Sequence, residues 1–313
     1  MPLTFGVYAG GLAATADGDV TPGPAEDPRR ITAALDELHG TLPFLVRGYL
    51  HYSDAAPGTP QAPPEPWRYA TGARRLDLVL CFREPGEDLT GWLGFIRRQI
   101  REHGDRLATI QITEEPENAG PGGDGEFPAV RRALIEGVHA AKHELARLGL
   151  DSLVGCNSTL RFDPEQAHWS SLKEIGDVVD YAGVDFFPDV FAPIPARKLG
   201  ETTAGVLRLF REGSMAAAGI PPTVPMHVTE HGWPTGPGRP LSRQAEVLET
   251  VVRTVAACAA ELNIGVYQHF ALRDADSAVD DAMFRFGLMT SDYRPKPAFG
   301  VYRDLVREFG AAC

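Results

Sequence analysis

The most constraining feature of this sequence is an alternation between short apolar runs and longer amphipathic stretches, which continues along the whole chain. Eight runs have the length and composition of strands: residues 3–8, 44–50, 76–82, 108–113, 152–156, 181–186, 225–229 and 265–270. Helical spacing predicts helices over residues 27–39, 89–102, 129–148, 164–179, 200–218, 242–262 and 297–309, with a short segment near 66–72. Alternating strands and helices indicate a parallel sheet. Eight such units in 313 residues predict one α/β domain over residues 1–313, a (β/α)₈ TIM barrel.

Charge and hydropathy restrict the partners of the chain. The net charge is −12, and an acidic surface repels phosphate backbones, so we expect no nucleic-acid partner. No apolar run approaches the ~20 residues that a membrane helix needs, so we expect no membrane partner. Nothing at the N-terminus resembles a secretion signal. This predicts a cytoplasmic protein, with a trimmed secreted chain as the alternative.

The cysteines and the nucleotide-binding motifs bear on cofactors. The four cysteines, at positions 81, 156, 258 and 313, form no CxxC pair, which favours buried free thiols over a disulfide or a metal site. The sequence contains no P-loop, GxGxxG or GxSxG pattern. We therefore expect neither a metal nor another cofactor.

Acidic side chains stand where two of the expected strands end. Glu114 and Glu115 follow the fourth strand, and Glu230 follows the seventh. Carboxylates directly after apolar strands are costly unless they are solvated, paired or used. In a barrel the C-terminal ends of the strands form the catalytic face, where the Pro/Gly-rich segments 53–66, 116–128 and 233–240 would also lie. Two carboxylates on opposite sides of a pocket suit glycoside chemistry.

The same segments resemble those of clan A glycoside hydrolases, which are (β/α)₈ barrels. The run Thr-Glu-Glu-Pro at 113–116 is similar to the motif of the acid/base, and Val-Thr-Glu-His-Gly-Trp-Pro-Thr at 228–235 closely matches the motif of the nucleophile. Further similarities lie at 46–49, 179–184, 270–274, 286–289 and 296–299, so the resemblance spans nearly the whole chain. It implies that Glu115 is the acid/base and Glu230 the nucleophile, and that Arg47 keeps Glu230 ionised. A buried ion pair in the barrel core is the alternative role for Arg47.

Three positions depart from the pattern of that family. Glu114 stands where the family has an Asn that bonds the sugar 2-OH, Phe187 stands where a Tyr orients the nucleophile, and His269 stands where a Trp often lines the pocket. A carboxylate at Glu114 would accept from a hydroxyl or pair with a cationic amino sugar. Its charge would also raise the pKa of Glu115, which favours a protonated acid. If the register slips by one residue, Glu114 is the proton donor instead.

Several other side chains are candidates for binding substrate. They are His51 after the second strand, Asn157 after the fifth, Asp185 on the sixth, Trp233 as a stacking platform for a sugar, and His269. Purely structural roles are the alternative for each, including a lid over the barrel for Trp233.

The sequence therefore supports three hypotheses. The first is a retaining glycoside hydrolase acting on a carbohydrate or glycoside, in which Glu230 forms a glycosyl-enzyme ester and Glu115 serves first as acid and then as base. The second, motivated by the three departures, is a catalytically silent carbohydrate-binding barrel. The third is an intracellular transglycosidase acting on small glycosides.

Overall fold

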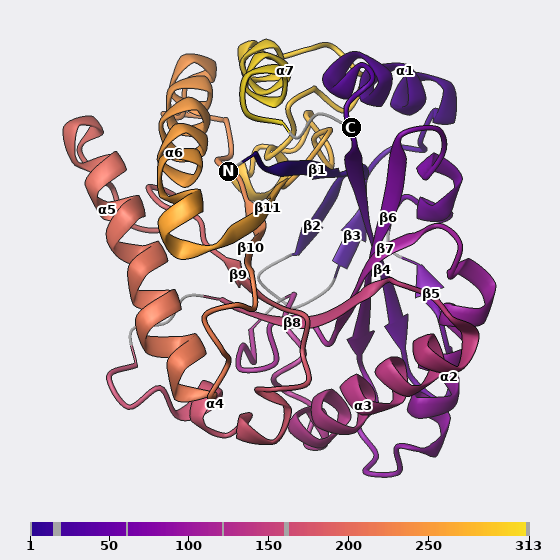
Figure 1. The fold of residues 1–313 in the computed structure, drawn as a ribbon. Coiled ribbons are helices and arrows are strands. Elements are labelled where there is room, and N and C mark those ends of the chain that lie inside the picture. Colours follow the sequence, from indigo (N-terminus) through magenta and orange to yellow (C-terminus); the bar gives the residue numbers. More distant parts are fainter. Residues whose placement is uncertain (1, 15–19, 61, 121, 160–162, 311–313) are drawn as a thin grey trace.

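Eight parallel strands close into a barrel at the centre of the computed structural model (Figure 1), which describes residues 2–14, 20–60, 62–120, 122–159 and 163–310. Around the barrel each strand pairs in parallel with the next, and β1 pairs with both β11 and β4, which closes the ring. This confirms the predicted barrel and its eight strands. Their bounds are β1 (Thr4–Tyr8), β4 (Phe44–Tyr52), β6 (Arg74–Phe82), β7 (Leu107–Ile112), β8 (Leu153–Thr159), β9 (Tyr181–Asp185), β10 (Met226–His231) and β11 (Ile264–His269).

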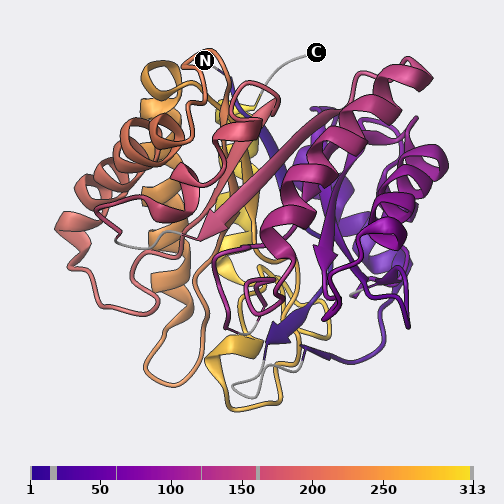
Figure 2. The same cartoon turned by 90° about the horizontal axis from the view of Figure 1, so that it is seen from below.

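The helices surround the strands (Figures 1 and 2) and mostly match the predicted ranges. They are α1 (Pro28–His39), α2 (Thr90–His103), α3 (Val130–Leu148), α5 (Ala196–Leu209), α6 (Leu241–Leu262) and α7 (Pro297–Phe309). The π-helical turn η3 (Phe210–Met215) extends α5, and the 3₁₀ turn η1 (Pro66–Tyr69) replaces the short predicted segment.

One predicted helix, over residues 164–179, is wrong. The segment forms only the single turn α4 (Ala167–Ser170) and the 3₁₀ turn η2 (Lys173–Ile175). Its buried residues are Trp169, Leu172, Ile175, Gly176 and Val179, with spacings of three and four residues. Such spacings fit two short turns as well as one continuous helix, so periodicity alone could not distinguish them.

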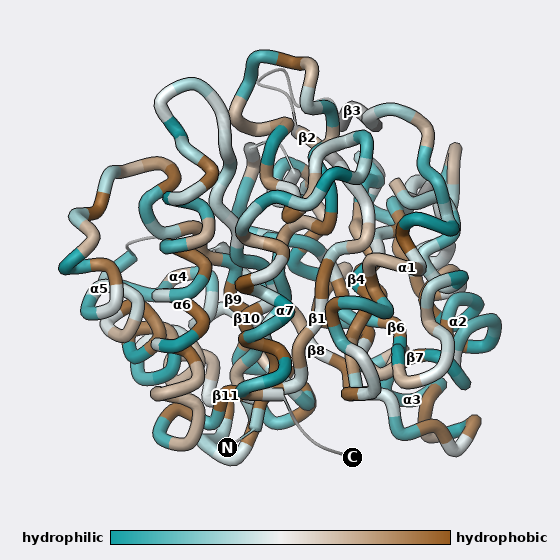
Figure 3. The backbone as a smooth tube through the Cα atoms, turned by 90° about the horizontal axis from the view of Figure 1, so that it is seen from above, coloured by the Kyte–Doolittle hydropathy of each residue, from teal (hydrophilic) through white to brown (hydrophobic). Residues whose placement is uncertain are grey.

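Three short strands and a turn that the sequence did not predict lie in the connecting loops. β2 (Leu12–Ala14) and β3 (Val20–Pro22) form an antiparallel pair, β5 (Thr59–Pro60) pairs with the end of β4, and η4 (Ala282–Phe284) follows β11. Figure 3 shows β2 and β3 at one end of the molecule and both chain ends at the other. The loops that follow the barrel strands thus build a mouth opposite the termini.

Side chains alternate between the two faces of each barrel strand, as β6 illustrates. Its outward residues join the apolar core between barrel and helices: Leu76, Leu78, Leu80 and Phe82. Val79 and Cys81 point inward and pack with Tyr8, Tyr49 and Ala271 in a separate small cluster. This is the period of two that a pleated strand imposes.

The barrel interior is polar at its centre. Asp77 of β6 accepts hydrogen bonds from Arg47 of β4 at 2.7 Å, Thr109 of β7 at 2.6 Å and Gln268 of β11 at 2.7 Å. One carboxylate therefore ties together four strands of the ring.

Three cysteines, Cys81, Cys156 and Cys258, are buried free thiols, and Cys313 lies outside the described residues. Within the described part of the chain, no helix has the length and apolar content to cross a bilayer.

Helix α2 anchors its side of the barrel through aromatic packing. Phe95 is completely buried, with its ring centre 5.2 Å from that of Tyr52 and 5.9 Å from that of Trp92. Trp92 also donates from its indole nitrogen to the Ala133 carbonyl of α3 at 2.9 Å. These contacts fix α2 and α3 together.

Phe95→Ala should lower the free energy of unfolding by ~3–5 kcal/mol, because it removes a buried ring and leaves a cavity. Phe191→Ala is the matched control, since Phe191 is 76% exposed, and it should change stability by less than ~0.5 kcal/mol. Urea unfolding of both variants checks this. Equal losses would contradict the packing described for α2.

Candidate active site

Acidic side chains from three strand ends converge at the mouth of the barrel. Glu230 lies on β10, Asp185 ends β9, and Glu114 and Glu115 directly follow β7. Carboxylate oxygens of Glu114, Glu115 and Asp185 lie within 4.8 Å of one another. The charge of Glu115 also acts on Glu230. The structure therefore brings both residues predicted to be catalytic to one face of the barrel.

Arg47 is the cation at the centre of this group. It is 1% exposed, and its Nη1 donates to Asp77 at 2.7 Å. Its Nη2 donates to Gln111 at 2.9 Å and lies 3.5 Å from Glu114. Its Nε lies 3.9 Å from Glu230. Arg47 thus forms the buried ion pair that was its alternative role, and it also lies beside Glu230 and opposes the rise of that residue's pKa.

Tyr49 supplies the donor that Phe187 cannot. Its hydroxyl donates to Oε1 of Glu230 and accepts from Nε of Arg47 at 2.8 Å. Phe187 instead packs against Phe270 and Phe286, with ring centres 6.4 and 5.7 Å away. Tyr49 was not among the predicted site residues, although it stands two residues after Arg47 on the same strand, so both side chains lie on the same face.

The backbone after β7 is held in an unusual conformation. Thr113 and Glu115 have φ values of 64° and 39°, in the left-handed region that costs energy for non-glycine residues. The buried carboxylate of Asp124 accepts from the backbone nitrogens of Glu114 at 2.8 Å and Phe82 at 2.7 Å. Asp124 comes from the loop ten residues further on, and no sequence pattern had indicated it.

Asn157 and Asp185 hold the two glutamates in place. Asn157 accepts from the backbone nitrogen of Glu115 at 2.9 Å, and its amide donates to Glu114 at 3.3 Å and to Asp185. Thr229 donates to Asp185 at 2.5 Å. Asn118 donates to the Glu115 carboxylate at 2.7 Å. Asn157 and Asp185 therefore lie at the predicted site, and Asn118 and Thr229 are additions to it.

Burial controls the protonation of the cluster. It raises the pKa of Glu230 and of Asp185 well above the ordinary value, with the neighbouring carboxylates adding to the effect and Arg47 opposing it. Burial also raises the pKa of Glu114, while Arg47 and bonds from Asn157, Gln111 and Asp185 lower it. The cluster thus retains protons at pH values where exposed carboxylates have lost them. Such a site can donate a proton to a leaving group.

The remaining three candidates differ in their surroundings. His51 is half-buried at the end of β4, where burial and the charge of Arg83 lower its pKa to about 3, so its ring is neutral. Trp233 is 5% exposed, its indole nitrogen donates to the Asp189 carbonyl at 3.0 Å, and Arg239 covers its ring at 5.1 Å. This packing leaves little ring surface for a sugar, so Trp233 is better described as a lid.

The expectation that His269 lines the pocket is wrong. Its ring is buried 5.4 Å from that of Tyr302 on α7, on the outer side of β11. The next residue, Phe270, points inward and stacks on Tyr8 at 5.1 Å. The error is a register shift of one, which exchanges the two faces of a strand.

A metal ion was not expected here, although Glu114, Glu115 and Asp185 have the spacing to hold one. Arg47 already supplies positive charge 3.5 Å from Glu114, and the amide of Asn157 donates to Glu114 and Asp185. Oxygens of Glu114 and Asp185 therefore already have partners within the protein.

Comparisons with known proteins address the fold. The chain is similar to a β-glucosidase from Exiguobacterium marinum (TM-score 0.63, 12% identity, 99% of each chain). It is also similar to a Rhizomucor miehei β-1,3-glucanosyltransferase (TM-score 0.61, 13% identity, 94% of this chain and 96% of that one). A third similar structure is a GH2 β-galacturonidase from Eisenbergiella tayi (TM-score 0.61, 14% identity), of which the chain spans 50%. No family model matches the sequence. No curated protein matches it either.

Arg47→Met should lower the free energy of unfolding by ~3–5 kcal/mol at pH 7.5, because it leaves Asp77 and Glu114 buried without their cation. The loss should be smaller at pH 5. Arg47 lowers the pKa values of Glu114 and Glu230, so in the variant these groups take up protons more readily in the folded state, and protonation removes the unpaired charge.

Urea unfolding at the two pH values measures both effects. Arg253→Met is the control, since Arg253 pairs with Glu249 and Glu308 on the surface, and it should change stability little. A loss for Arg47→Met that grows as the pH falls would contradict the role given to Arg47.

Proposed function

We propose that this protein is a retaining glycoside hydrolase in which Glu230 is the nucleophile and Glu115 the acid/base. The observation that carries the proposal is the setting of Glu230, which accepts from Tyr49, lies 3.9 Å from Arg47 and is near enough to Glu114 and Glu115 for their charges to raise its pKa. Enzymes that act on glycosidic bonds share the fold, including the E. marinum β-glucosidase over 99% of both chains. The substrate class is a carbohydrate or a glycoside.

The proposed reaction has two steps. Protonated Glu115 gives its proton to the leaving oxygen while Glu230 attacks the anomeric carbon and forms an ester. Glu115, now a base, takes a proton from water, which attacks the ester and releases the sugar with retained configuration. This mechanism requires the two carboxyl groups to lie ~5–5.5 Å apart.

The surrounding residues take two kinds of role. We assign Arg47 and Tyr49 as positioning residues, because both act on the Glu230 carboxylate. Glu114, Asn157 and Asp185 remain candidates for contact with sugar hydroxyls, and His51 is a neutral candidate at the rim. Their hydrogen bonds to one another would orient any group that reaches a hydroxyl.

Transglycosylation is the second candidate activity. The similar R. miehei structure is a β-1,3-glucanosyltransferase that this chain matches over nearly the whole of both lengths. The same glycosyl-enzyme ester serves either reaction, because only the acceptor differs. Product analysis with and without an added sugar acceptor separates them, since a transferase forms longer products at the expense of free sugar.

Glu230→Gln should abolish cleavage of aryl glycosides, and Glu115→Gln should slow it by roughly 10²–10⁴-fold. The loss for Glu115→Gln should shrink with nitrophenyl leaving groups, because they depart with little help from a proton. Glu126→Gln, an exposed residue of the same loop, is the matched control and should leave rates unchanged.

The measurement is a screen of aryl glycosides combined with a 2-fluoroglycosyl fluoride that traps the nucleophile. Peptide mapping should find the label on Glu230. Sugar binding without cleavage and without label would favour the silent carbohydrate-binding barrel. Cleavage at the original rate by Glu230→Gln would refute the assignment.

Tyr49→Phe should move the acidic limb of the kcat/KM profile to higher pH. The hydrogen bond from Tyr49 lowers the pKa of Glu230, so its removal raises that pKa, and the nucleophile then ionises only at higher pH. Tyr52→Phe is the control, because the Tyr52 hydroxyl donates to Asp54 and not to Glu230. If the acidic limb of the kcat/KM profile is unchanged in Tyr49→Phe, Tyr49 does not act on the ionisation of Glu230.

A further inference from the structure

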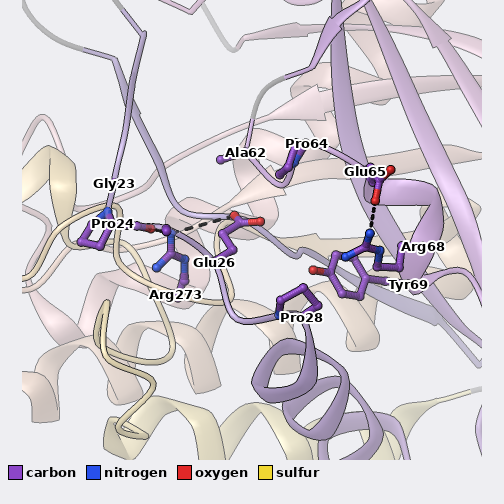
Figure 4. A pocket seen from close by; sticks show the side chains of 11 residues that line it. Gly23, Pro24, Glu26, Pro28, Ala62, Pro64, Glu65, Arg68, Tyr69 and Arg273 are labelled. Atoms are coloured by element: carbon purple, nitrogen blue, oxygen red, sulfur yellow. Dashed lines mark hydrogen bonds and ion pairs between the residues drawn. The ribbon is translucent and has the colours of Figure 1, made fainter.

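Three loops at the mouth of the barrel meet around Glu26, beside a cavity of about 530 Å³ (Figure 4). The cavity is lined by residues between β3 and α1, by residues between β5 and η1 together with η1 itself, and by Arg273 beyond β11. These belong to the connections that follow β1, β4 and β11 of the ring. None of the carboxyl groups assigned to the reaction lines the cavity. Glu26 therefore lies at a junction of loops that the proposed mechanism does not use.

The loop before α1 is packed closely against the loop after β11. A Cβ atom added to Gly23 would collide with the carbonyl group of Ala275. Arg273 donates to the carbonyl of Pro24 at 2.6 Å, and the backbone nitrogen of Asp27 donates to the hydroxyl of Tyr293 at 2.8 Å. These contacts enclose the residue between Pro24 and Asp27, so the Glu26 carboxyl group has little room to move while the two loops stay together.

The Glu26 carboxyl group has no hydrogen-bond donor in this enclosure. Its side chain is only 8% exposed, and both oxygens are buried without a hydrogen bond from any residue that the structure describes. The closest approach of Arg273 is 3.9 Å, from Nη2 to Oε1, which is too long for a hydrogen bond. A buried carboxylate ion without donors is costly, and the neutral acid loses much less on burial. The packed arrangement thus favours the protonated form.

The charges around Glu26 leave this preference in place. Burial raises the pKa of Glu26 to about 7, although the charge of Arg273 opposes the rise. Three tyrosines lie around the carboxyl group and stay protonated in this pH range, because burial and the charge of Glu26 raise their pKa values: Tyr8 of β1, Tyr69 of η1 and Tyr293. The other charged groups nearby form pairs with each other, Asp27 with Arg30 and Glu65 with Arg68.

The ionised form of Glu26 can obtain donors only if the wall of the cavity moves. In the packed arrangement both oxygens are shielded from the cavity, so water does not reach them. The cavity is roomy enough for several water molecules, each of which could donate to a carboxylate. Movement of the segment 23–26 away from the loop after β11 would bring the carboxylate to that water. Loss of one proton and separation of the two loops are therefore linked.

We propose that Glu26 is a proton-controlled latch between the loops at the mouth of the barrel. With the proton in place, the segment 23–26 stays packed against the loop after β11. When the proton leaves to solvent, the carboxylate turns to water in the cavity and the two loops separate. The latch does not depend on the proposed reaction, because neither Glu115 nor Glu230 takes part in it.

The direct test is an NMR titration of the full-length protein from pH 5 to pH 9. The ¹³C signal of the Glu26 side-chain carboxyl group should titrate with a midpoint near pH 7. The methyl signals of Ala25 and Ala62, which line the cavity, should move with the same midpoint. In Glu26→Gln these methyl transitions should disappear, because the amide stays neutral. Glu65→Gln, on the wall that Figure 4 shows across from Glu26, is the matched control and should keep the transitions of the wild type.

The folding equilibrium gives a second readout. The pKa of Glu26 lies at about 7 in the folded protein against an ordinary value of 4.5 in the unfolded chain, so its stabilising effect is complete below pH 4.5 and is lost as the pH rises through 7. Between pH 6 and pH 8.5 the folding constant of the wild type should fall roughly tenfold relative to that of Glu26→Gln, as measured by urea unfolding. If Glu26→Gln does not fold, Glu26→Met, which is also uncharged, replaces it.

Three results would overturn the proposal. A midpoint of the Glu26 carboxyl signal below pH 5 would show that the ion is stable in the packed arrangement. Methyl transitions that persist unchanged in Glu26→Gln would assign them to another group. Equal pH dependence of unfolding in the wild type and in Glu26→Gln would show that Glu26 holds no additional proton in the folded state. The wild-type titration needs no variant, and all three readouts are independent of glycoside cleavage.

Discussion

The buried pair of Arg47 and Asp77 is the interaction on which the rest of this structure depends. A guanidinium in a barrel core is stable only when its donors find acceptors, and here they reach Asp77, Gln111, Tyr49 and Glu114. The pair links the centre of the ring to the carboxyl groups at its mouth. A change at Arg47 would therefore affect both the packing of the barrel interior and the charge balance of the site.

Among the described residues of the site, the carboxyl groups near Arg47 outnumber the one guanidinium that they share. Desolvation and like charge raise the pKa values of Glu114, Asp185 and Glu230, and a bond from Asp185 stabilises the charge on Glu114. Protonation thus removes part of the negative charge of this cluster. Glu114 adds one more carboxylate to the cluster. Asp124 accepts from its backbone nitrogen, between the left-handed residues Thr113 and Glu115.

The barrel could be predicted because buried parallel strands are short apolar runs. Each run can be recognised from its own residues, without knowledge of its partners. The sequence also placed Glu115, Glu230, Asn157 and Asp185 at the C-terminal ends of the strands, where the structure has them. The prediction failed where the structure depends on the register of a strand or on residues that are distant in the sequence. His269 and Phe270 differ by one residue at a strand end, and the buried positions of segment 164–179 fit two short turns as well as one helix. Asp124 belongs to a loop without periodicity.

The pairing of the first and last parts of the chain has a consequence for how the molecule is organised. Leu3 donates from its backbone nitrogen to the Phe309 carbonyl at 3.0 Å and bridges to Gly310, so the end of α7 lies against the start of β1. In a closed barrel every strand pairs with two neighbours. The pairing of the strands therefore does not depend on which connection between them carries the chain ends. We expect a circular permutant to form the same barrel and the same site. In such a variant residues near Leu3 and Gly310 are linked, and new ends are opened in another surface loop.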